Sequence, residues 1–393
     1  MSAQLLTHAQ MVLPGERILS GNLLIEDGRI AAFNPANVPA HASTLDCGGR
    51  LLTPGLIDLH THGIERHFYH WDQPPEAFAA ALRALPKYGT TCVVPTIVPP
   101  GKAALLEPLA RLLETLPRGT GAVVPGFHLE GPFVALGGAA CPTLPGDLGL
   151  LQDLITACGQ RVSIMSLSPE QSDILPVIQR LCEQNIVPFI THTRASVEQT
   201  EAAIEAGARH ATHFYDVFPV PEEKDAGARP VGAVEALLAD PRASVDFICD
   251  GVHVHPTAIR AAVAAKGWKN VMLITDSNIG SGLPAGEYDT PWGYRVRVAP
   301  GEAARHATKG FLAGSALTMN VGMQNLLRWL APALTPEQIW AMGTLNPARL
   351  LGLKHKGRIA PGADADLVLW DEQLNAVRTW VGGECRFTRH ETL

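Results

Sequence analysis

The sequence predicts an α/β fold: a (β/α)8 TIM-like barrel with a small β-sandwich domain built from both termini. Two observations favour it. The middle of the chain alternates short apolar segments with segments of helical periodicity, and both ends are rich in short strands and turns. A chain of 393 residues with 46% hydrophobic residues can bury one large barrel core and a smaller second core.

The two ends of the chain are expected to form one small domain. Near the N-terminus, residues 22–25 and 29–33 flank Asp27-Gly28, a strong hairpin signal because glycine accepts a positive φ. Near the C-terminus, Pro361-Gly362 precedes an apolar strand at 366–370. We therefore expect residues 1–53 and 354–393 to form the β-sandwich domain, and residues 54–353 to form the barrel.

Between these ends the chain contains eight short apolar segments, most of them followed by a helical stretch. Continuous apolar runs are typical of parallel strands buried on both faces. Eight such units over about 300 residues fit a closed barrel better than an open sheet. The expected strands are 56–60, 90–95, 122–128, 162–167, 186–191, 208–213, 245–249 and 271–275, and the expected helices are 75–88, 102–116, 172–183, 197–206, 230–239 and 257–266.

Composition and charge exclude several classes of protein. The net charge is −7 with no dominant basic patch, so nucleic acid and anionic membrane surfaces are not expected partners. No apolar run approaches the ~18 residues that span a bilayer, and the N-terminus lacks a secretory pattern. The seven cysteines are scattered and never form a C-x-x-C pair, which indicates reduced thiols in a cytoplasmic protein.

Residues able to bind a metal follow the ends of the predicted strands, where barrel enzymes carry their chemistry. His60 and His62 end the first strand. Because residues i and i+2 of a strand share a face, both imidazoles can enter the barrel mouth and bind one cation. Asp250 ends the seventh strand.

Further candidate ligands end other strands. Glu130 can ligate one metal or bridge two, although a loop carboxylate facing water is the alternative. His128 shares its face and could ligate a metal, orient Glu130, or simply pack. His192 and His213 offer imidazole nitrogens suited to Zn²⁺ or Fe²⁺. His210 lies three residues before His213, faces the opposite side of an extended strand, and is interpreted as structural.

Asp276 follows the last predicted strand. A carboxylate beside a metal-bound water can accept its proton and return it to a leaving amine. The alternative is that Asp276 caps the N-terminus of a helix. We favour the catalytic interpretation because five candidate ligands accompany it.

At these residues the sequence resembles the amidohydrolase superfamily and, within it, the N-acetylglucosamine-6-phosphate deacetylase family. The segments that carry the resemblance run in family order across nearly the whole chain. They are PGLIDLHTHG (54–63), HLEGPF (128–133), THTRAS (191–196), ATHFYDVF (211–218), CDGVHVHP (249–256), TDSNIGSG (275–282), LAGSALTMN (312–320), LNPARLLGL (345–353) and GRIAPGADADLVLWD (357–371).

The resemblance implies hydrolysis of an N-acetyl amino sugar to acetate and the amine, by a homodimer. It implies one or two divalent metal ions per subunit, with Zn²⁺ favoured over Fe²⁺. In a binuclear centre Glu130 would be the bridging ligand. Asp276 would be the general acid and base. The implied metal ligands are His60, His62, Glu130, His192 and His213.

Departures from the family pattern concern the substrate. The implied substrate-binding residues are Asp216, Val217, Arg229 and His253. Asp216 stands where the family has an asparagine beside the sugar phosphate, and a carboxylate repels a phosphate dianion unless it is offset. Asp216 could instead bind sugar hydroxyls or a substrate amine. Alternatively it is solvated, and Arg229 and His253 suffice to bind the phosphate.

The resemblance makes N-acetylglucosamine 6-phosphate or a close relative the leading substrate. One alternative function is an amidohydrolase acting on an unphosphorylated N-acetyl sugar, an N-acyl amino acid or a cyclic amide. The other alternative is a protein that binds metal without catalysing a reaction.

Overall fold

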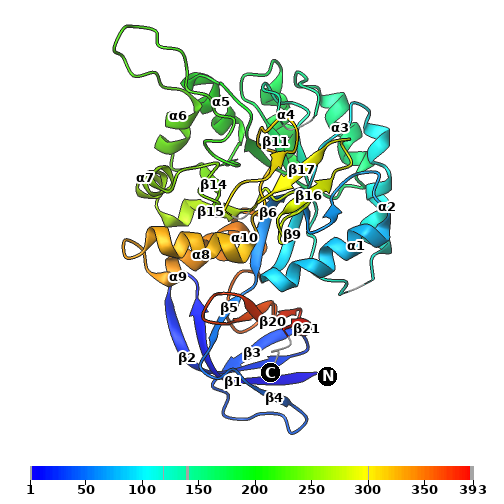
Figure 1. Ribbon diagram of the computed structural model, residues 1–393, viewed down its shortest axis with the longest axis vertical. Coiled ribbons are helices and arrows are strands. Elements are labelled where there is room, and N and C mark those ends of the chain that lie inside the picture. The colour runs from blue at the N-terminus through cyan, green and yellow to red at the C-terminus, as the bar shows by residue number, and fades with distance from the viewer. Residues whose placement is uncertain (1, 118, 139–140, 300, 390–393) are drawn as a thin grey trace.

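The computed structural model describes residues 2–117, 119–138, 141–299 and 301–389. Eight parallel strands form the barrel, and helices surround it (Figure 1). In chain order the barrel strands are β6 (Leu56–Thr61), β9 (Thr90–Ile97), β10 (Phe127–Glu130), β11 (Val162–Leu167), β12 (Val187–Ile190), β13 (His210–Ala211), β14 (Ser244–Ile248) and β15 (Val271–Ile274). Each strand pairs with the next along the chain, as the sequence predicts.

The barrel closes between its first and last strands through the backbone. The amide of Asp276 donates to the carbonyl of His60 at 2.8 Å, and the amide of His62 donates to the carbonyl of Ser277 at 2.8 Å. These two hydrogen bonds lie just beyond the end of β15. The closing seam of the barrel is therefore also the place where three candidate site residues meet.

The helices of the barrel layer are α1 (Pro75–Ala84), α2 (Pro108–Thr115), α3 (Leu148–Ala157), α4 (Ile174–Glu183), α5 (Val197–Ala206), α6 (Ala233–Ala239) and α7 (Pro256–Lys266), followed by α8 (Met319–Leu330), α9 (Pro336–Gly343) and α10 (Leu345–Leu350). Short 3-10 helices lie at Leu85–Tyr88, Ala103–Leu106 and Trp268–Asn270. Local sequence explains α5: Ser196 and Gln199 form a reciprocal capping box at its start, and Gly207 ends it. In the part of the chain that the structure describes, no helix is long and apolar enough to cross a membrane.

Several strand bounds differ from the prediction by one or two residues, and two strands keep only two of their predicted residues. The third begins at Phe127 instead of 122, because Pro125 has no amide to donate and Val123 makes only an isolated bridge to Cys92. The sixth is limited to His210–Ala211, because the chain turns at His213, which has φ 37°. In both strands a backbone constraint limits the strand pairing to fewer residues than the apolar segment contains.

Strands from both termini form one further sheet, drawn in blue and red on one side of the barrel in Figure 1. Its strands are β1 (Ala3–Leu13), β2 (Arg17–Glu26), β3 (Arg29–Phe33), β4 (Ser43–Asp46), β5 (Leu51–Pro54), β19 (Leu367–Trp370), β20 (Ala376–Val381) and β21 (Glu384–Thr388). A bulge between Leu6 and Ala9, with His8 at φ 51°, bends β1. The first half of β1 therefore pairs with β4 and the second half with β5.

A third, small sheet follows β15 and was not predicted. It contains β16 (Gly286–Asp289), β17 (Arg295–Val298) and β18 (Arg305–His306) in antiparallel order. A two-stranded ribbon, β7 (Gly63–Ile64) with β8 (His67–Phe68), continues from the end of β6. Ile279 and Val296 share a hydrophobic cluster with Phe68, so the small sheet packs next to this ribbon.

The terminal sheet and the barrel share buried contacts. Trp370 of β19 donates to Thr53 Oγ1 at 2.8 Å and packs against Trp340 of α9 with ring centroids 5.6 Å apart. Lys356 Nζ lies 2.6 Å from Asp366 Oδ2 and 3.0 Å from an oxygen of Asp364. Because Asp366 is buried, its charge depends on this ammonium for compensation.

We expect Lys356→Met to lower the free energy of unfolding by ~3 kcal/mol, because it leaves the Asp366 carboxylate buried without its cation. Lys354→Met makes the same change of charge at an exposed neighbour and should cost less than ~0.5 kcal/mol. Urea unfolding of both variants measures the difference. Equal stabilities for the two variants would contradict this role for Lys356.

Candidate active site

Six candidate residues meet at the mouth of the barrel, each at or just after the carboxyl end of a strand. Their placement follows from the parallel sheet, since all carboxyl ends face the same opening. β6 supplies two of them, and β10, β12, β13 and β15 supply one each. They are His60, His62, Glu130, His192, His213 and Asp276.

Glu130 lies at the centre of the group and is almost fully buried. Its Oε1 lies 3.5 Å from His60 Nε2, 3.3 Å from His192 Nε2 and 3.2 Å from His213 Nε2. Its Oε2 lies 3.3 Å from His62 Nε2. One carboxylate thus contacts imidazoles from three separate strand ends, and the alternative of a loop carboxylate facing water is wrong.

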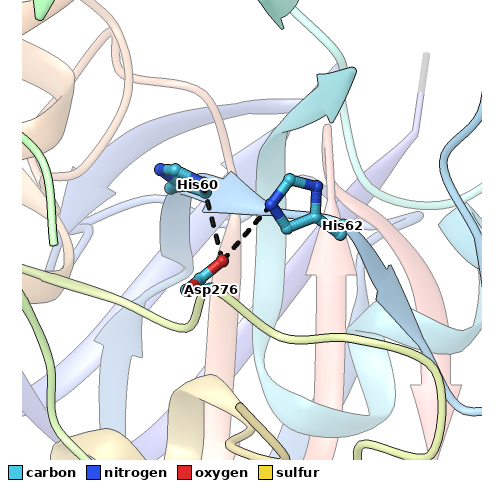
Figure 2. Close-up of side chains that lie close together, drawn as sticks. All are labelled: His60, His62 and Asp276. Atoms are coloured by element: carbon cyan, nitrogen blue, oxygen red, sulfur yellow. Dashed lines mark ion pairs between the residues drawn. The ribbon is translucent and has the colours of Figure 1, made fainter. Parts of the chain in front are cut away.

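Asp276 approaches the first histidine pair from the opposite side of the barrel seam. Its Oδ1 lies 3.5 Å from His60 Nε2 and 3.4 Å from His62 Nε2, and Figure 2 shows both contacts. No helix begins at Asp276 in the described chain, so the helix-cap interpretation is wrong. The carboxylate instead shares its two imidazole neighbours with Glu130.

The backbone at several of these positions is in the left-handed region. The φ angles are 46° at His192, 37° at His213 and 45° at Asp276, all non-glycine residues. Such conformations cost about 1–3 kcal/mol each and persist where surrounding structure fixes them. Sharp turns directly after β12, β13 and β15 thus direct the three side chains into the mouth of the barrel.

A buried hydrogen-bond network beneath the site fixes the seam. Asp58, two residues before His60 on the same face of β6, accepts from Thr275 Oγ1 at 2.6 Å and from the Thr275 amide at 3.2 Å. Thr61 and Ser277 bond through their hydroxyls at 2.7 Å. Burial raises the pKa of Asp58 to about 7. These contacts connect β6 to β15 and limit movement of the side chains above them.

A second buried carboxylate positions His213. Asp246 of β14 accepts from the His213 amide at 2.6 Å, and its other oxygen lies 2.7 Å from His210 Nε2. The Nδ1 of His210 lies 2.7 Å from the Ser244 hydroxyl. His210 therefore supports the turn that carries His213 and does not enter the cluster.

His128 lies below the cluster. Both of its ring nitrogens have protein partners: Nδ1 is 3.1 Å from the Leu59 carbonyl and Nε2 is 2.6 Å from the Ser166 hydroxyl. Burial lowers its pKa to about 3, so the ring is neutral. Its ring centroid is 4.6 Å from that of His60. His128 thus packs against a candidate ligand with no nitrogen left to bind a cation.

The charges of the cluster are strongly coupled. Burial would raise the pKa of Glu130, but the surrounding imidazoles, His60 first, hold it well below its usual range. Burial likewise opposes protonation of His62 and His213, yet their carboxylate partners raise the pKa of each to about 10. Protons on these imidazoles balance the carboxylates, and a bound cation would replace those protons.

The donor set fits a divalent cation. His60 Nε2 is buried without a hydrogen-bond partner while two carboxylates lie 3.5 Å away, the arrangement expected of a metal ligand. Two groups of donor atoms each lie within 4.8 Å of one another: His60, His62 and Asp276, and His60, Glu130 and His213. Imidazole and carboxylate ligands suit Zn²⁺ and Fe²⁺.

A cavity of about 180 Å³ opens above the cluster. Three of the four predicted substrate-binding residues line it: Asp216, Val217 and His253. Trp292 and Tyr294, on the connection from β16 to β17, also line it, and their rings stack with centroids 5.8 Å apart. The unpredicted small sheet therefore contributes an aromatic wall to the candidate site.

Arg229, the fourth predicted substrate-binding residue, is not brought to this cavity. It lies on the segment before α6 that projects from the barrel in Figure 1, with 83% of its side chain exposed. Its guanidinium pairs with Glu235 at 3.0 Å and borders a separate hollow beside Phe218 and Pro221. Within this chain the structure places Arg229 apart from the other three residues.

Sequence reasoning missed the residues that support and cover the site. Asp58 carried a usable signal, since it shares the strand face of His60 two residues later. Asp246 lies in the middle of an apolar strand, where a carboxylate must have a buried partner. Trp292 and Tyr294 carried no signal, because their contribution depends on how the small sheet folds over the barrel.

Comparison with known proteins identifies the group to which the chain is similar. The family model of the amidohydrolase family matches residues 51–392. N-acetylglucosamine-6-phosphate deacetylase from Vibrio furnissii is 32% identical over 96% of this chain and 94% of the relative. N-acetylgalactosamine-6-phosphate deacetylase from Escherichia coli O157:H7 is also 32% identical, over 92% of this chain and 93% of that one.

Solved structures agree with this grouping. A mutant of N-acetyl-D-glucosamine-6-phosphate deacetylase from Mycobacterium smegmatis, in complex with N-acetyl-D-glucosamine-6-phosphate, superposes with a TM-score of 0.85 at 28% identity. The match covers 99% of this chain and all of that one. The family match and the similarity in sequence and fold lead to one conclusion: the chain belongs to the amidohydrolase family.

Proposed function

We propose that the protein hydrolyses the N-acetyl group of an N-acetylated amino sugar, N-acetylglucosamine 6-phosphate or a close relative, to acetate and the amine. The observation that carries the proposal is the convergence of four histidines and Glu130 beside Asp276 at the barrel mouth. The names of the relatives supply the substrate class.

The residues proposed to hold the metal are His60, His62, Glu130, His192 and His213. Zn²⁺ is the ion best suited to this set, with Fe²⁺ as the alternative. Glu130 presents one oxygen to His62 and the other to the remaining histidines, so its carboxylate would help to hold one ion or two. A bound divalent cation supplies a Lewis acid that polarises the amide carbonyl and lowers the pKa of water.

Asp276 is proposed to carry the proton. Its carboxylate lines the cavity and lies against His60 and His62. It accepts a proton from the attacking water as the water oxygen bonds to the carbonyl carbon. It then returns that proton to the nitrogen as the C–N bond breaks, so that acetic acid and a neutral amine form, and the acid afterwards loses its own proton to water to become acetate.

The assembly and location of the protein are also proposals. The family resemblance supports a homodimer. All seven cysteines are free thiols, four of them buried, which supports a cytoplasmic location.

The substrate class is tested by measuring acetate release by the metal-loaded protein from a panel of amides. The panel contains N-acetylglucosamine and N-acetylgalactosamine, each with and without a 6-phosphate, together with N-acyl amino acids and a cyclic amide. We expect turnover of at least one amino sugar. Release from the amino acids alone would refute the sugar assignment, and metal binding without any turnover would refute the proposal of an enzyme.

We expect Asp276→Asn to lower kcat by ~10²–10⁴-fold, because the amide cannot accept a proton from water. Metal content, measured by atomic emission on the same samples, should stay within about twofold, since all five proposed ligands remain. Asp153→Asn, an identical change on an exposed face of α3, serves as the control. Full activity of Asp276→Asn would exclude the proposed proton transfer.

Removing a central imidazole should weaken metal binding directly. We expect His60→Ala to raise the Kd for Zn²⁺ by more than the ~10–100-fold typical of losing a residue that only orients a ligand. His41→Ala, at an exposed histidine between β3 and β4 of the terminal sheet, should leave the Kd unchanged. Competition with a chromogenic chelator measures both values, and equal Kd values would rule out His60 as a ligand.

A further inference from the structure

Trp292 lies on the side of the site cavity where β6 meets the small sheet. Its indole lines the cavity, with its ring centroid 6.3 Å from that of His62. It also packs edge to face against Phe68 of β8, with ring centroids 4.1 Å apart. The indole is thus held by the ribbon that continues β6 and lies next to the candidate cation cluster.

The loop that carries Trp292 is fixed by hydrogen bonds. Both the amide and the hydroxyl of Thr290 donate to the Tyr294 carbonyl, at 3.0 and 2.7 Å. Gly293 has φ 79°, which lets the chain turn tightly between them. The Tyr294 ring in turn stacks on His306 of β18, with centroids 4.8 Å apart. The small sheet therefore sets the position of the indole.

Two opposite sides of the cavity differ in polarity. Val98 directly follows β9, and Asp216 lies in the turn after β13. These two strands lie opposite each other in the closed barrel, since three strands separate them in either direction. Trp292, next to His62 of the neighbouring strand β6, extends the Val98 side. One side therefore presents apolar groups, and the other presents a carboxylate.

This polarity suits the two ends of an N-acyl amino sugar, which lie on opposite sides of a planar trans amide. Sugar hydroxyls donate and accept hydrogen bonds, which matches Asp216 and His253 on the lining of the cavity. An acyl chain offers apolar surface, which matches Val98 and Trp292. With the amide beside Asp276, the acyl group is expected on the Trp292 side. This orientation needs no assumption about groups that a partner subunit of the proposed homodimer adds on the sugar side.

The rings of Trp292 and Tyr294 separate the cavity from a second space. Both rings also line an open hollow of about 730 Å³, together with Thr308 and Lys309. The site cavity, about 180 Å³, has to hold both the amide and the adjacent part of the sugar. A longer acyl chain would therefore have to displace the indole, and forcing extra methylenes against packed side chains is unfavourable.

We propose that Trp292 is a specificity-determining residue that closes the acyl end of the cavity, so that the enzyme selects N-acetyl over longer N-acyl groups. This inference rests on the proposed deacetylase function and adds to it the size of the acyl group. The indole contacts the acetyl methyl group of the bound substrate. Removing the indole joins the cavity to the second hollow and gives a longer chain space to enter.

The experiment compares kcat/KM for the N-acetyl and N-butyryl forms of the amino sugar that the substrate panel identifies. Release of the free amine by the metal-loaded full chain measures both. We expect the wild type to favour the acetyl form by ~10-fold or more, since one methylene in an apolar pocket changes kcat/KM by about 10–200-fold. Trp292→Ala should shift the ratio toward the butyryl form by ~10-fold or more. Trp292→Phe, which keeps a ring against Phe68, should shift it in the same direction by ~3-fold or more.

Trp268→Ala is the matched control. Trp268 lies in the 3-10 helix before β15, at the end of the barrel away from the mouth, and is half-buried. The substitution removes the same side chain and should leave the ratio unchanged. Urea unfolding of each variant shows that the comparison is made on folded protein, and Trp292→Phe carries the test if Trp292→Ala does not fold.

The outcomes separate the two proposals. Equal kcat/KM values for the two acyl forms in the wild type, or a ratio that both Trp292 variants leave within about twofold of wild type, would overturn the role of Trp292. An equal loss for both acyl forms would also overturn it, because the indole would then contact the sugar. Release of amine from none of the N-acetyl sugars would instead refute the proposed function.

Discussion

The buried carboxylate of Glu130 is the constraint on which the rest of the site depends. A buried charge without partners would cost several kcal/mol, so the fold must bring compensating groups to it. Four imidazoles from β6, β12 and β13 do so, at 3.2–3.5 Å. The three strand ends cannot move apart without exposing Glu130 to an uncompensated environment. The cluster is thus a part of the barrel's structure as well as a place for a cation.

The barrel seam couples this cluster to Asp276. Backbone hydrogen bonds join Asp276 to His60 and His62 to Ser277, so the bonds that close the barrel also fix the distance between the proposed proton carrier and the first histidine pair. Asp58 stiffens the same seam from below. Strained φ angles at the turns are tolerated because the surrounding hydrogen bonds leave these turns few other conformations.

The upper wall and the base of the cavity differ in the types of residue that form them. The base consists of residue types whose chemistry suits a cation, whereas the wall combines the aromatic pair on the small sheet with Asp216 and His253. Two relatives of this chain are named for different sugars, one for N-acetylglucosamine 6-phosphate and one for N-acetylgalactosamine 6-phosphate. In this chain Asp216 places a carboxylate in that wall, and this carboxylate has no hydrogen-bond partner among the described residues.

The sequence by itself determined the barrel, its strand order and the candidate metal-binding and proton-carrying residues. It could do so because the apolar runs and the polar residues that follow them are local features of the sequence. Apolar runs mark buried strands, and the residues that follow them must share the carboxyl-end face of a parallel barrel. Tertiary structure alone decided the early end of β13, the bend in β1, the aromatic wall and the position of Arg229. The aromatic wall depends on packing between segments far apart in the chain. The end of β13 and the bend in β1 depend on residues with a positive φ, which the apolar pattern does not reveal.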